Sequence, residues 1–447
     1  MTESPASLDI LARLLELAKR NGAEAADAVM IDSAHLSVAQ RLGRPEKIER
    51  AESRDVGLRV LIGRRQAIVS TTDLKPDALG ETAERAVAMA KVAPEDPWCG
   101  LADAGDIART IPDLDICDPS EPAAEALVER ARAAEDAARA VSGVTNSEGA
   151  EAGWGRSRIA LAASNGFAQS YAMSSHSISA SVLAGEGTAM ERDWDYASAV
   201  FAADLPAPEE IGRTAGERAV RRLGARKVKT RQVPVVLEWR VAGGLLRSLT
   251  GAINGAAIAR GTSFLKDSLG KPLFAPGIRI VDDPLRRRGL RSKPFDAEGL
   301  PTRTRALIDD GRLTTWLLDL GAARKLGLDS TGSAARSVSG PPQPSPTNVY
   351  LEPGSESPET LIAGIASGFF ITEMIGMGVN LVTGDYSRGA TGFWIEKGEI
   401  AYPVSEMTVA GNLRDMFRTL TPADDLRFRY GTDAPTVRID GMTVAGL

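Results

Sequence analysis

Apolar residues in the first ninety positions recur at spacings that predict a helix, several strands and a second helix. Residues 8, 11, 15 and 18 form one apolar helical stripe, and Asn21-Gly22 follows as a stop signal. Short runs rich in Val, Ile and Leu then predict strands at 28–31, 36–42, 56–62 and 66–70. Apolar residues at 79, 83, 86 and 90 indicate the second helix. This order predicts an α+β unit.

The middle of the chain again predicts both helices and strands, after a segment whose apolar residues show no helical or strand periodicity. Residues 94–121 are rich in Pro, Asp and Gly, which favours a long connection. Asn165-Gly166 separates two strand-like runs at 158–163 and 167–173, and Asn-Gly is a strong hairpin signal. The remaining predicted elements are a helix at 122–141, a strand at 178–183 and a helix at 208–223.

Short strands and tight turns dominate from residue 231 onward. Asp309-Asp310-Gly311, Glu396-Lys397-Gly398-Glu399 and Asp440-Gly441 each separate two strand-like runs and predict three hairpins. Ser330–Pro346 lacks apolar anchors and predicts a mobile loop. The expected fold class is therefore α+β: an N-terminal region of helices and antiparallel sheet, then an antiparallel β-rich domain. The predicted units are 1–93, a linker at 94–121, 122–230 and 231–447.

Composition and charge narrow the classes of function. The formal net charge of −6 argues against a dedicated nucleic-acid binder. No apolar stretch is long enough to span a membrane, and the first residues lack the pattern of a secretory signal. Two cysteines, Cys99 and Cys117, cannot supply a disulfide framework. We expect a cytoplasmic protein.

Only two histidines are available for catalysis or metal binding. His35 and His176 lie in separate strand-like segments, whereas a zincin motif places two His on one helix. A zinc site assembled from both His and both Cys is the less favoured alternative. Phosphate-cradling and dinucleotide-binding glycine motifs are missing from the sequence.

Carboxylates cluster near Asp282-Asp283 and at Asp296 with Glu298. Such pairs can perform acid–base chemistry or hold a cation. Asp beside Pro or Gly also stabilises turns, which is the favoured interpretation. A basic run at 213–231 contains no aromatic residue and is interpreted as a solvated helix face or a patch for an acidic partner.

Several blocks of the C-terminal half together resemble the TldD/PmbA peptidase family. They cover about half of the chain in order, and the densest runs from Val382 to Glu396. The others are Arg260–Asp267, Ile280–Pro284, the FDAEGLPT stretch at 295–302, the TNVYL stretch at 347–351, and Ala410–Leu413. In the N-terminal half, Ser164–Phe167 is similar to the family's middle region.

The resemblance also identifies where a zinc motif would stand. TldD-type members carry His-Glu-x-x-x-His on a helix, with a distant Cys. The matching positions here are Arg247, Ser248 and Ala252, and the stretch 428–433 near the third ligand has no Cys. A guanidinium stays protonated and cannot ligate a metal, and Ser and Ala supply neither base nor imidazole.

This pattern is typical of the PmbA-type (TldE-type) subunit. It implies a cytoplasmic heterodimer that degrades unfolded peptides and trims leader peptides, with zinc held only by a TldD-type partner. No catalytic residue and no cofactor are expected in this chain, which could form a homodimer in isolation. Asn348, Ser387 and Arg388 are candidates for peptide binding or the subunit interface, the last two in glycine-rich turns. Two alternatives stay open: a self-contained hydrolase using Asp282, Asp283, Asp296 or Glu298, and a purely regulatory peptide-binding protein.

Overall fold

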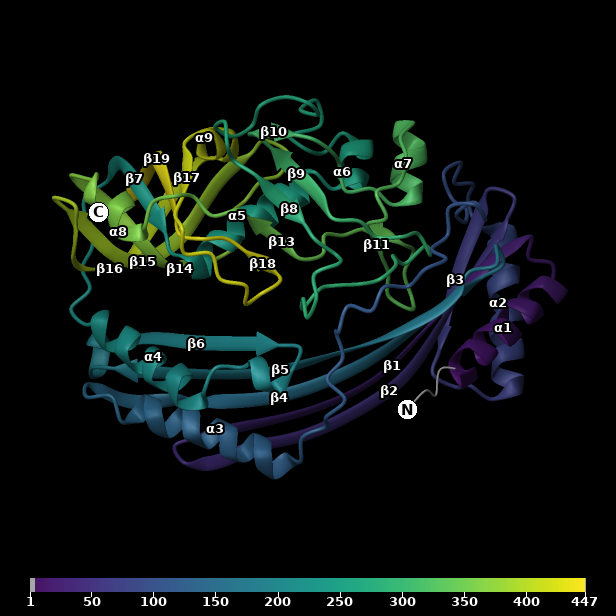
Figure 1. Cartoon of the computed structure of the whole chain (residues 1–447), viewed down its shortest axis with the longest axis horizontal. Coiled ribbons are helices and arrows are strands. Elements are labelled where there is room, and N and C mark those ends of the chain that lie inside the picture. Colours follow the sequence, from purple (N-terminus) through teal and green to yellow (C-terminus); the bar gives the residue numbers. More distant parts are fainter. Residues whose placement is uncertain (1–4, 447) are drawn as a thin grey trace.

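A computed structural model describes residues 5–446. The N-terminal half forms one six-stranded antiparallel sheet of very long strands, and the C-terminal half lies over one face of it (Figure 1). Successive side chains of a strand point to opposite faces, so one face meets helices and the other meets the C-terminal half. In sheet order the strands are β3 (Arg65–Thr71), β2 (Arg44–Ile62), β1 (Ala25–Arg41), β4 (Val144–Ala163), β5 (Ala168–Ala184) and β6 (Glu191–Ala199).

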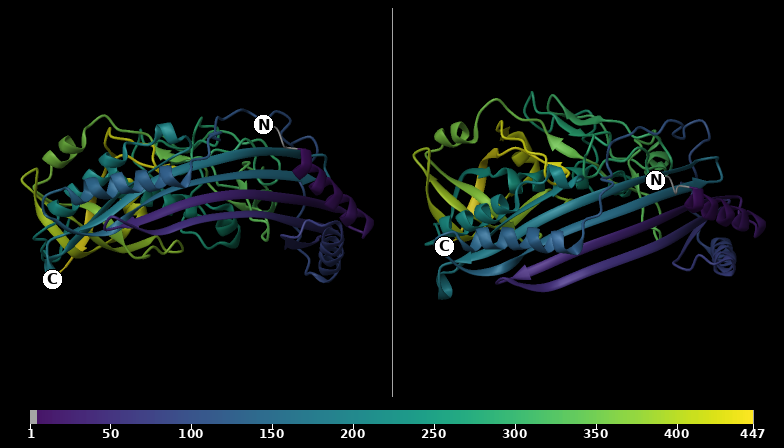
Figure 2. Two further views of the ribbon diagram at one scale, coloured as in Figure 1. Left: turned by 90° about the horizontal axis from the view of Figure 1, so that it is seen from below. Right: turned by 60° about the horizontal axis from the view of Figure 1, so that its bottom comes forward.

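Two pairs of helices cover the outer face of this sheet, one pair at each end of the long strands (Figure 2). Helices α1 (Pro5–Arg20) and α2 (Pro76–Val92) bury one hydrophobic core against β1–β4. Helices α3 (Ala124–Arg139) and α4 (Pro208–Arg221) bury a second core against β1, β4, β5 and β6. A Cβ on Gly212 of α4 would lie 1.9 Å from the Ala134 carbonyl oxygen, so only glycine allows this close crossing.

The strands are longer than their apolar patterns predict. The segments 28–31 and 36–42, expected as two strands, fall in β1 except for Leu42, and 167–173 and 178–183 fall in β5 except for Phe167. The apolar pattern fades at mid-strand because this part of the sheet lies between the two helix-covered cores. Backbone pairing continues through it without a turn. The two segments expected as separate domains, 1–93 and 122–230, therefore share one sheet. Their boundaries remain predictions from the sequence.

The connection between those segments crosses the sheet without a helix or strand of its own over residues 93–123. It is nevertheless fixed. The Asp118 carboxylate accepts hydrogen bonds from the backbone N–H groups of Ser120 and Ala202, and Ser174 Oγ accepts one from the Asp118 N–H at 2.7 Å. Short 3₁₀ turns at Gly187–Ala189 and Ala202–Asp204 flank β6.

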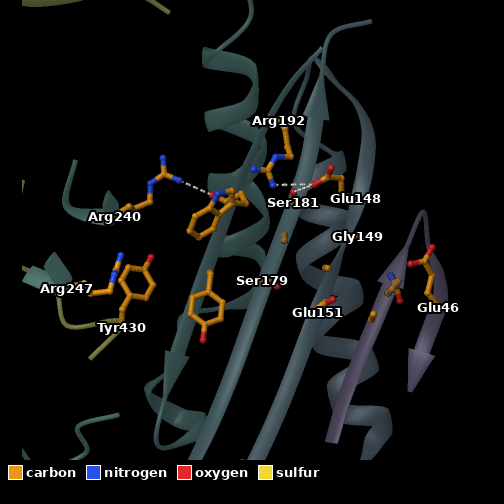
Figure 3. A pocket seen from close by; sticks show the side chains of 16 residues that line it. Glu46, Glu148, Gly149, Glu151, Ser179, Ser181, Arg192, Arg240, Arg247 and Tyr430 are labelled. Atoms are coloured by element: carbon orange, nitrogen blue, oxygen red, sulfur yellow. Dashed lines mark hydrogen bonds and ion pairs between the residues drawn. The ribbon is translucent and has the colours of Figure 1, made fainter. Parts of the chain in front are cut away.

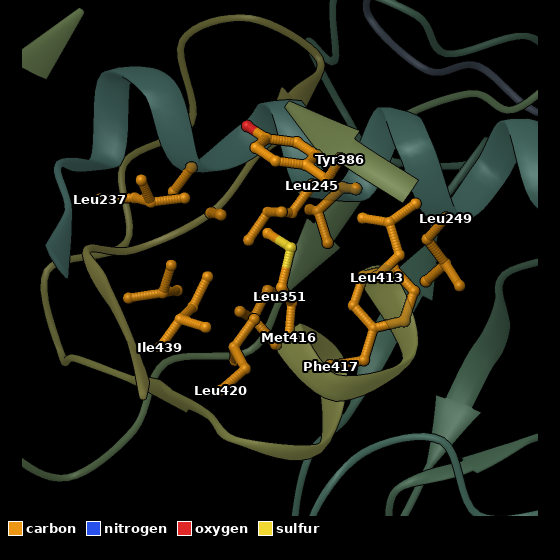
Figure 4. Close-up of a cluster of buried hydrophobic side chains, with 14 of the residues drawn as sticks. Leu237, Leu245, Leu249, Leu351, Tyr386, Leu413, Met416, Phe417, Leu420 and Ile439 are labelled. Carbon is orange, nitrogen blue, oxygen red and sulfur yellow. The ribbon is translucent and has the colours of Figure 1, made fainter. Parts of the chain in front are cut away.

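The C-terminal half is β-rich, as expected, and encloses the largest core of the chain (Figure 4). Five strands pair in a closed ring: β7 (Arg231–Leu237), β14 (Ser367–Ile375), β15 (Asp385–Glu396), β16 (Glu399–Asn412) and β19 (Val437–Ala445), with β17 (Leu420–Pro422) attached to β19. A second sheet contains β10 (Arg312–Leu313), β9 (Arg305–Asp309), β8 (Ile280–Asp282), β13 (Val349–Leu351) and β18 (Thr432–Asp433). The pairs β7–β14 and β13–β18 are parallel. The helices are α5 (Trp239–Ala252), α6 (Gly255–Arg260), α7 (Leu320–Leu326), α8 (Pro358–Ala363) and α9 (Leu413–Arg418).

Two of the three predicted hairpins are confirmed. Asp310 and Gly311 connect β9 to β10, and Lys397 and Gly398 connect β15 to β16, all four with positive φ. The third prediction is wrong. Residues on both sides of Asp440-Gly441 pair with β7, so β19 is one strand with a bulge at this dipeptide. Asp-Gly also suits a bulge, because Gly441 adopts a φ of 83°.

Ser330–Pro346, expected as a mobile loop, is anchored by polar contacts. Its short strands β11 (Ala334–Ala335) and β12 (Gln343–Pro344) pair with each other. The Arg336 side chain is 1% exposed and forms an ion pair with Asp27 of β1, which also pairs with Arg59 of β2. This buried ion pair, together with the packing of Val338 against an apolar cluster that includes Val29 and Leu161, holds the segment against the sheet.

Candidate functional site

A cleft of about 680 Å³ separates the inner face of the long sheet from helix α5 (Figure 3). Its floor consists of Glu148–Glu151 of β4, Ser179–Ser181 of β5 and three side chains of β6, with contributions from β1 and β2. Arg240 and Arg247 of α5 and Tyr430 face this floor from the opposite side. The α5 wall therefore carries only cationic and aromatic groups, whereas the sheet floor combines glutamates with an arginine and two aromatic rings.

Successive side chains of β6 point to opposite faces of the sheet, and this alternation determines which of them reach the floor of the cleft. Arg192, Trp194 and Tyr196 line the cleft, while Asp193 and Asp195 point to the other face. Both aspartates are 3% exposed and form ion pairs with arginines. Asp193 lies 3.0 Å from Nη1 of Arg240, and Asp195 lies 2.8 Å from Nη1 of Arg218. Since Arg240 belongs to α5, the first pair fixes the helix to the edge of the sheet.

The spacing of residues in α5 explains which side chains reach the cleft. Ala242, Leu245, Leu246 and Leu249 are buried in the C-terminal core. Arg240, Gly244 and Arg247 follow at intervals of four and three on another stripe of the helix. Burial alone would lower the pKa of Arg240, but attraction to Glu238 and Asp193 outweighs it and raises this pKa. Arg240 is therefore a fixed cation.

Aromatic rings form the far corner of the cleft. The Tyr430 ring is stacked with Tyr196 at 6.0 Å and with Trp239 at 6.1 Å between centroids. Burial raises the pKa of Tyr430 to about 12, so its hydroxyl stays protonated at neutral pH. Within residues 5–446 that hydroxyl has no hydrogen-bond partner.

The three positions matched to the zinc motif lie on α5 but do not converge on one point. Arg247 is exposed to the cleft. Ser248 Oγ donates to the Gly244 carbonyl oxygen at 3.1 Å within the helix, and Ala252 is fully buried in the core. The stretch matched to the third ligand does lie beside α5, since a Cβ on Gly243 would be 2.6 Å from the Thr432 carbonyl oxygen. These side chains do not fit a zinc ion.

Two further arginines lie near Arg247. Its pKa is lowered by partial loss of solvent, although much of the side chain remains exposed, and then by repulsion from Arg291 and Arg388. Asp433 opposes this shift, but burial raises the pKa of Asp433 itself, and its Oδ1 already accepts the backbone N–H groups of Arg429 and Tyr430.

The predicted binding residues have different surroundings. Ser387 and Arg388 lie within strand β15, paired with Ala410 and Val409 of β16, so the predicted turn location is wrong. Ser387 is exposed, and Arg388 Nε donates to the Gly376 carbonyl oxygen at 2.9 Å. Glycine occurs at position 378 because the segment between β14 and β15 approaches β15 closely: a Cβ on Gly378 would lie 1.6 Å from the Ser387 carbonyl oxygen.

Asn348 is 3% exposed and holds a loop together. Its Oδ1 accepts the Arg291 N–H at 2.9 Å, and its Nδ2 donates to Asp283 O at 2.7 Å and Ser292 Oγ at 2.8 Å. The amide is thus used to position Arg291 and its neighbours.

The carboxylates considered for hydrolysis accept hydrogen bonds in turns. Asp282 accepts the N–H and hydroxyl of Thr347, and Asp283 accepts the Leu285 N–H at 3.2 Å. Burial raises the pKa of Asp282. These bonds favour the structural interpretation of the pair.

Asp296 and Glu298 are buried in the FDAEGLPT stretch. Asp296 accepts three backbone N–H groups, from Glu298, Leu300 and Ala334. Glu298 accepts the Leu320 N–H at 2.8 Å. Burial and the nearby Asp296 raise the pKa of Glu298 well above its usual range. This pair therefore joins the hairpin β11–β12 to helix α7 rather than lining the cleft.

The two histidines point to opposite faces of the sheet. His35 aligns through Gly155 with Ser175, and His176 is the next residue of β5. His176 is buried with Nε2 3.1 Å from Asp118 Oδ2. Within the described part of the chain, His, Cys, Asp and Glu form no group of three or more placed to hold a metal ion.

The aromatic residues on the floor of the cleft could not be identified from the sequence. Trp194 and Tyr196 have only one signal, the charged–aromatic alternation Glu-Arg-Asp-Trp-Asp-Tyr at 191–196, which is a strand pattern. The position of Trp194 and Tyr196 opposite α5 depends on how the two halves of the chain pack, and no local sequence pattern predicts this packing.

None of the helices in residues 5–446 is long and apolar enough to cross a membrane.

Most of the chain matches models of known domain families. Residues 26–90, 117–223 and 230–446 match the families described as PmbA/TldA metallopeptidase domain 1, central domain and C-terminal domain. These matches place the cleft between the first two of these domains and the third.

Individual proteins agree with the family matches. The chain is 39% identical to Metalloprotease PmbA of Escherichia coli O157:H7 over 436 residues, which cover 97% of this chain and 94% of that protein. It is 28% identical to a Metalloprotease TldD homolog of Haemophilus influenzae over 232 residues, covering 48% of each. The structure of TldE from Thermococcus kodakarensis has the same fold, with a TM-score of 0.87, 20% identity, and coverage of 98% of this chain and 100% of that chain.

Proposed function

The chain belongs to the TldD/PmbA metallopeptidase family, and we propose that it is the PmbA-type subunit of a heterodimeric zinc peptidase. In this proposal a TldD-type partner holds the zinc and performs hydrolysis. The present chain completes the peptide chamber without a catalytic residue or cofactor of its own. The substrates are unfolded peptides, including leader peptides, and the complex works in the cytoplasm.

The observation that carries this proposal is the chemistry at the zinc-motif positions. Arg247 offers a permanent cation in place of the first ligand, and Ser248 offers a hydroxyl already bonded within the helix. Ala252 points its methyl group into the core. Restoring zinc binding would require imidazoles at positions 247 and 252 and a thiolate near 428–433, so one substitution would not recreate the site.

The cleft supports a role in holding peptides. Its volume lies in the range of about 300–1,000 Å³ typical of ligand sites. The rings of Trp194, Tyr196 and Tyr430 can pack against side chains of varied shape, while Ser179 and Ser181 offer hydrogen bonds. Such a surface suits peptides of varied sequence.

A free strand edge supports association with another chain. β3 reaches only Val56 of β2, so residues 44–54 pair with β1 on one side alone and are exposed. Their unpaired backbone groups can accept a strand from a partner subunit or an extended peptide. The charges along this edge limit indiscriminate pairing.

Similarity to a TldD homologue over about half of the chain supports a related partner. Relatives that share a fold can assemble through equivalent surfaces, which suits a heterodimer of a PmbA-type and a TldD-type chain.

Co-expression with the TldD-type homologue of the same genome tests this proposal. We expect co-purification of the two chains, one zinc per heterodimer in the partner, and chelator-sensitive hydrolysis of an unfolded peptide by the complex only. Substituting the two motif histidines in the partner should abolish activity, whereas Arg247→Ala should leave the zinc content unchanged. One tightly bound zinc in the isolated chain, with chelator-sensitive hydrolysis, would contradict the proposal.

A further inference from the structure

Three guanidinium groups converge beside the cleft from distant parts of the sequence. Arg247 belongs to α5, Arg388 to β15, and Arg291 to the connection between β8 and β9. A Cβ on Gly244 would lie 3.8 Å from Nη2 of Arg247 and 3.8 Å from Nη1 of Arg388. Arg291 lies against Gly431, whose Cβ would be 2.9 Å from Arg291 Cγ. Gly244 therefore leaves an open space between two of the cations.

No carboxylate neutralises this arginine group (Arg247, Arg291 and Arg388). Within residues 5–446 none of the three forms an ion pair. Asp433 attracts Arg247 without reaching ion-pair distance, and its Oδ1 accepts two backbone N–H groups. Arg388 donates Nε to the Gly376 carbonyl oxygen and also hydrogen-bonds the Tyr386 side chain, and neither partner carries a negative charge. Like charges held together without a counter-ion form an attractive site for an anion.

The cleft indicates which anion would be accepted. On the wall opposite Arg247, Glu46, Glu148 and Glu151 outnumber Arg192, which pairs with Glu148, and they would repel a polyanion such as nucleic acid. A single carboxylate on an otherwise neutral chain avoids this repulsion. Its planar geometry also suits paired hydrogen bonds from guanidinium groups.

We infer that Arg247, Arg291 and Arg388 form a carboxylate-binding site that grips an acidic group of a peptide lying in the cleft. This inference rests on the proposed peptide-holding role and specifies the chemistry recognised. The carboxylate can come from the C-terminus of the peptide or from an Asp or Glu side chain. The site uses the positions of the family's zinc helix for substrate binding.

Peptide binding to the isolated chain tests the inference without requiring hydrolysis. The probe is a decapeptide of Gly, Ala, Ser and Thr carrying a neutral dye at its N-terminus, measured by fluorescence anisotropy at low salt. Four versions are compared: a free C-terminal carboxylate, a C-terminal amide, the amide with a central Glu, and the amide with a central Gln. If the site binds the C-terminal carboxylate, we expect the free acid to bind about tenfold or more tightly than the amide. If it binds an acidic side chain, we expect the same difference between the Glu version and the Gln version.

Gly244 provides a matched pair of variants. A Cβ at this position makes ordinary contacts of 3.8 Å and no clash, so Gly244→Glu can place an internal carboxylate between Arg247 and Arg388, whereas Gly244→Gln has the same shape without the charge. We expect Gly244→Glu to bind acid and amide peptides equally and Gly244→Gln to keep the preference. Thermal unfolding confirms that both variants are folded.

The results separate this inference from the proposed function. Equal affinity of the wild-type chain for acid and neutral peptides, or no binding of any of them, would overturn the carboxylate site while leaving the heterodimer intact. Conversely, an inactive or unformed heterodimer would refute the proposed function without changing the preference measured on the isolated chain.

Discussion

The buried charges that join the two halves of the chain predict a large loss of stability on Asp27→Asn. Asp27 and Arg59 are directly opposite each other on β1 and β2. Oδ2 of Asp27 accepts Nε of Arg59 at 2.8 Å, and Oδ1 accepts Nη1 of Arg336 from the C-terminal half. The side chains of Asp27, Arg59 and Arg336 are only 4%, 4% and 1% exposed.

Asparagine would keep the shape and remove the charge. Its single oxygen can serve only one arginine, and its NH₂ group would face the donors of the other. Removing one member of a buried ion pair costs about 3–5 kcal/mol, because an unpaired charge stays buried. For 447 residues at about 2.1 cal/mol/K each, 4 kcal/mol corresponds to a Tm lower by about 4 °C if the chain unfolds as one unit.

The same two strands provide the control. Asp32 and Arg54 are also directly opposite each other and 2.7 Å apart, but their side chains are 31% and 56% exposed. Asp32→Asn should therefore cost less than about 1 kcal/mol. Urea denaturation of both variants measures the difference. Equal losses in the two variants would refute the argument that burial makes the Asp27 contact strong.

The dependence of stability on acid pH provides an independent test of the Asp27 ion pairs. Burial raises the pKa of Asp27, but attraction to Arg59 and Arg336 outweighs burial and lowers it. Because the folded pKa lies below the unfolded value of about 3.9, the stabilisation is present above that value and is lost as pH falls through the folded pKa. Asp27→Asn should remove this part of the acid dependence, whereas Asp32→Asn should leave it.

Three further substitutions test other parts of the structure. Leu249→Ala should lower the free energy of unfolding by about 2–5 kcal/mol, because Leu249 is fully buried in the C-terminal core; a loss below about 1 kcal/mol in urea would indicate a loosely packed site. Ser387→Ala should leave kcat of the reconstituted complex within a few-fold, because neither histidine lies on β15 or its neighbours; a loss of several orders of magnitude would identify Ser387 as a nucleophile. Lys397→Asn should raise the free energy of unfolding by up to about 1 kcal/mol, because Lys397 has a φ of 52° in a hairpin turn that Asn adopts more easily; an unchanged Tm would mean that Lys397 is not strained.

Local patterns in the sequence predicted most elements, because their causes are local. Gly311 and Gly398 supply positive φ at hairpin turns, and both turns lie where they were predicted. Asp440-Gly441 shows the limit of the same rule, because the dipeptide satisfies a bulge as well as a turn. Only the pairing of both flanks with β7 decides between the two.

The long-range parts of the structure left no local signal. Asp27 and Arg336 are 309 positions apart, and neither has a neighbour in sequence that indicates the contact. The resemblance placed Arg247 at a lost metal ligand, which follows from residue chemistry. The approach of Arg291 and Arg388 to it depends on how α5, β15 and an intervening loop pack, and could not be predicted.

The continuity of the long strands has a practical consequence for recombinant fragments. β1 pairs with β4 along Asp27–Gln40. A fragment that ended at the apparent boundary after residue 93 would leave that whole edge of β1 without its neighbour. Such an edge is a template for aggregation. An expression vector for a stable N-terminal half should therefore extend through α4, so that both helix pairs and all six strands are synthesised together.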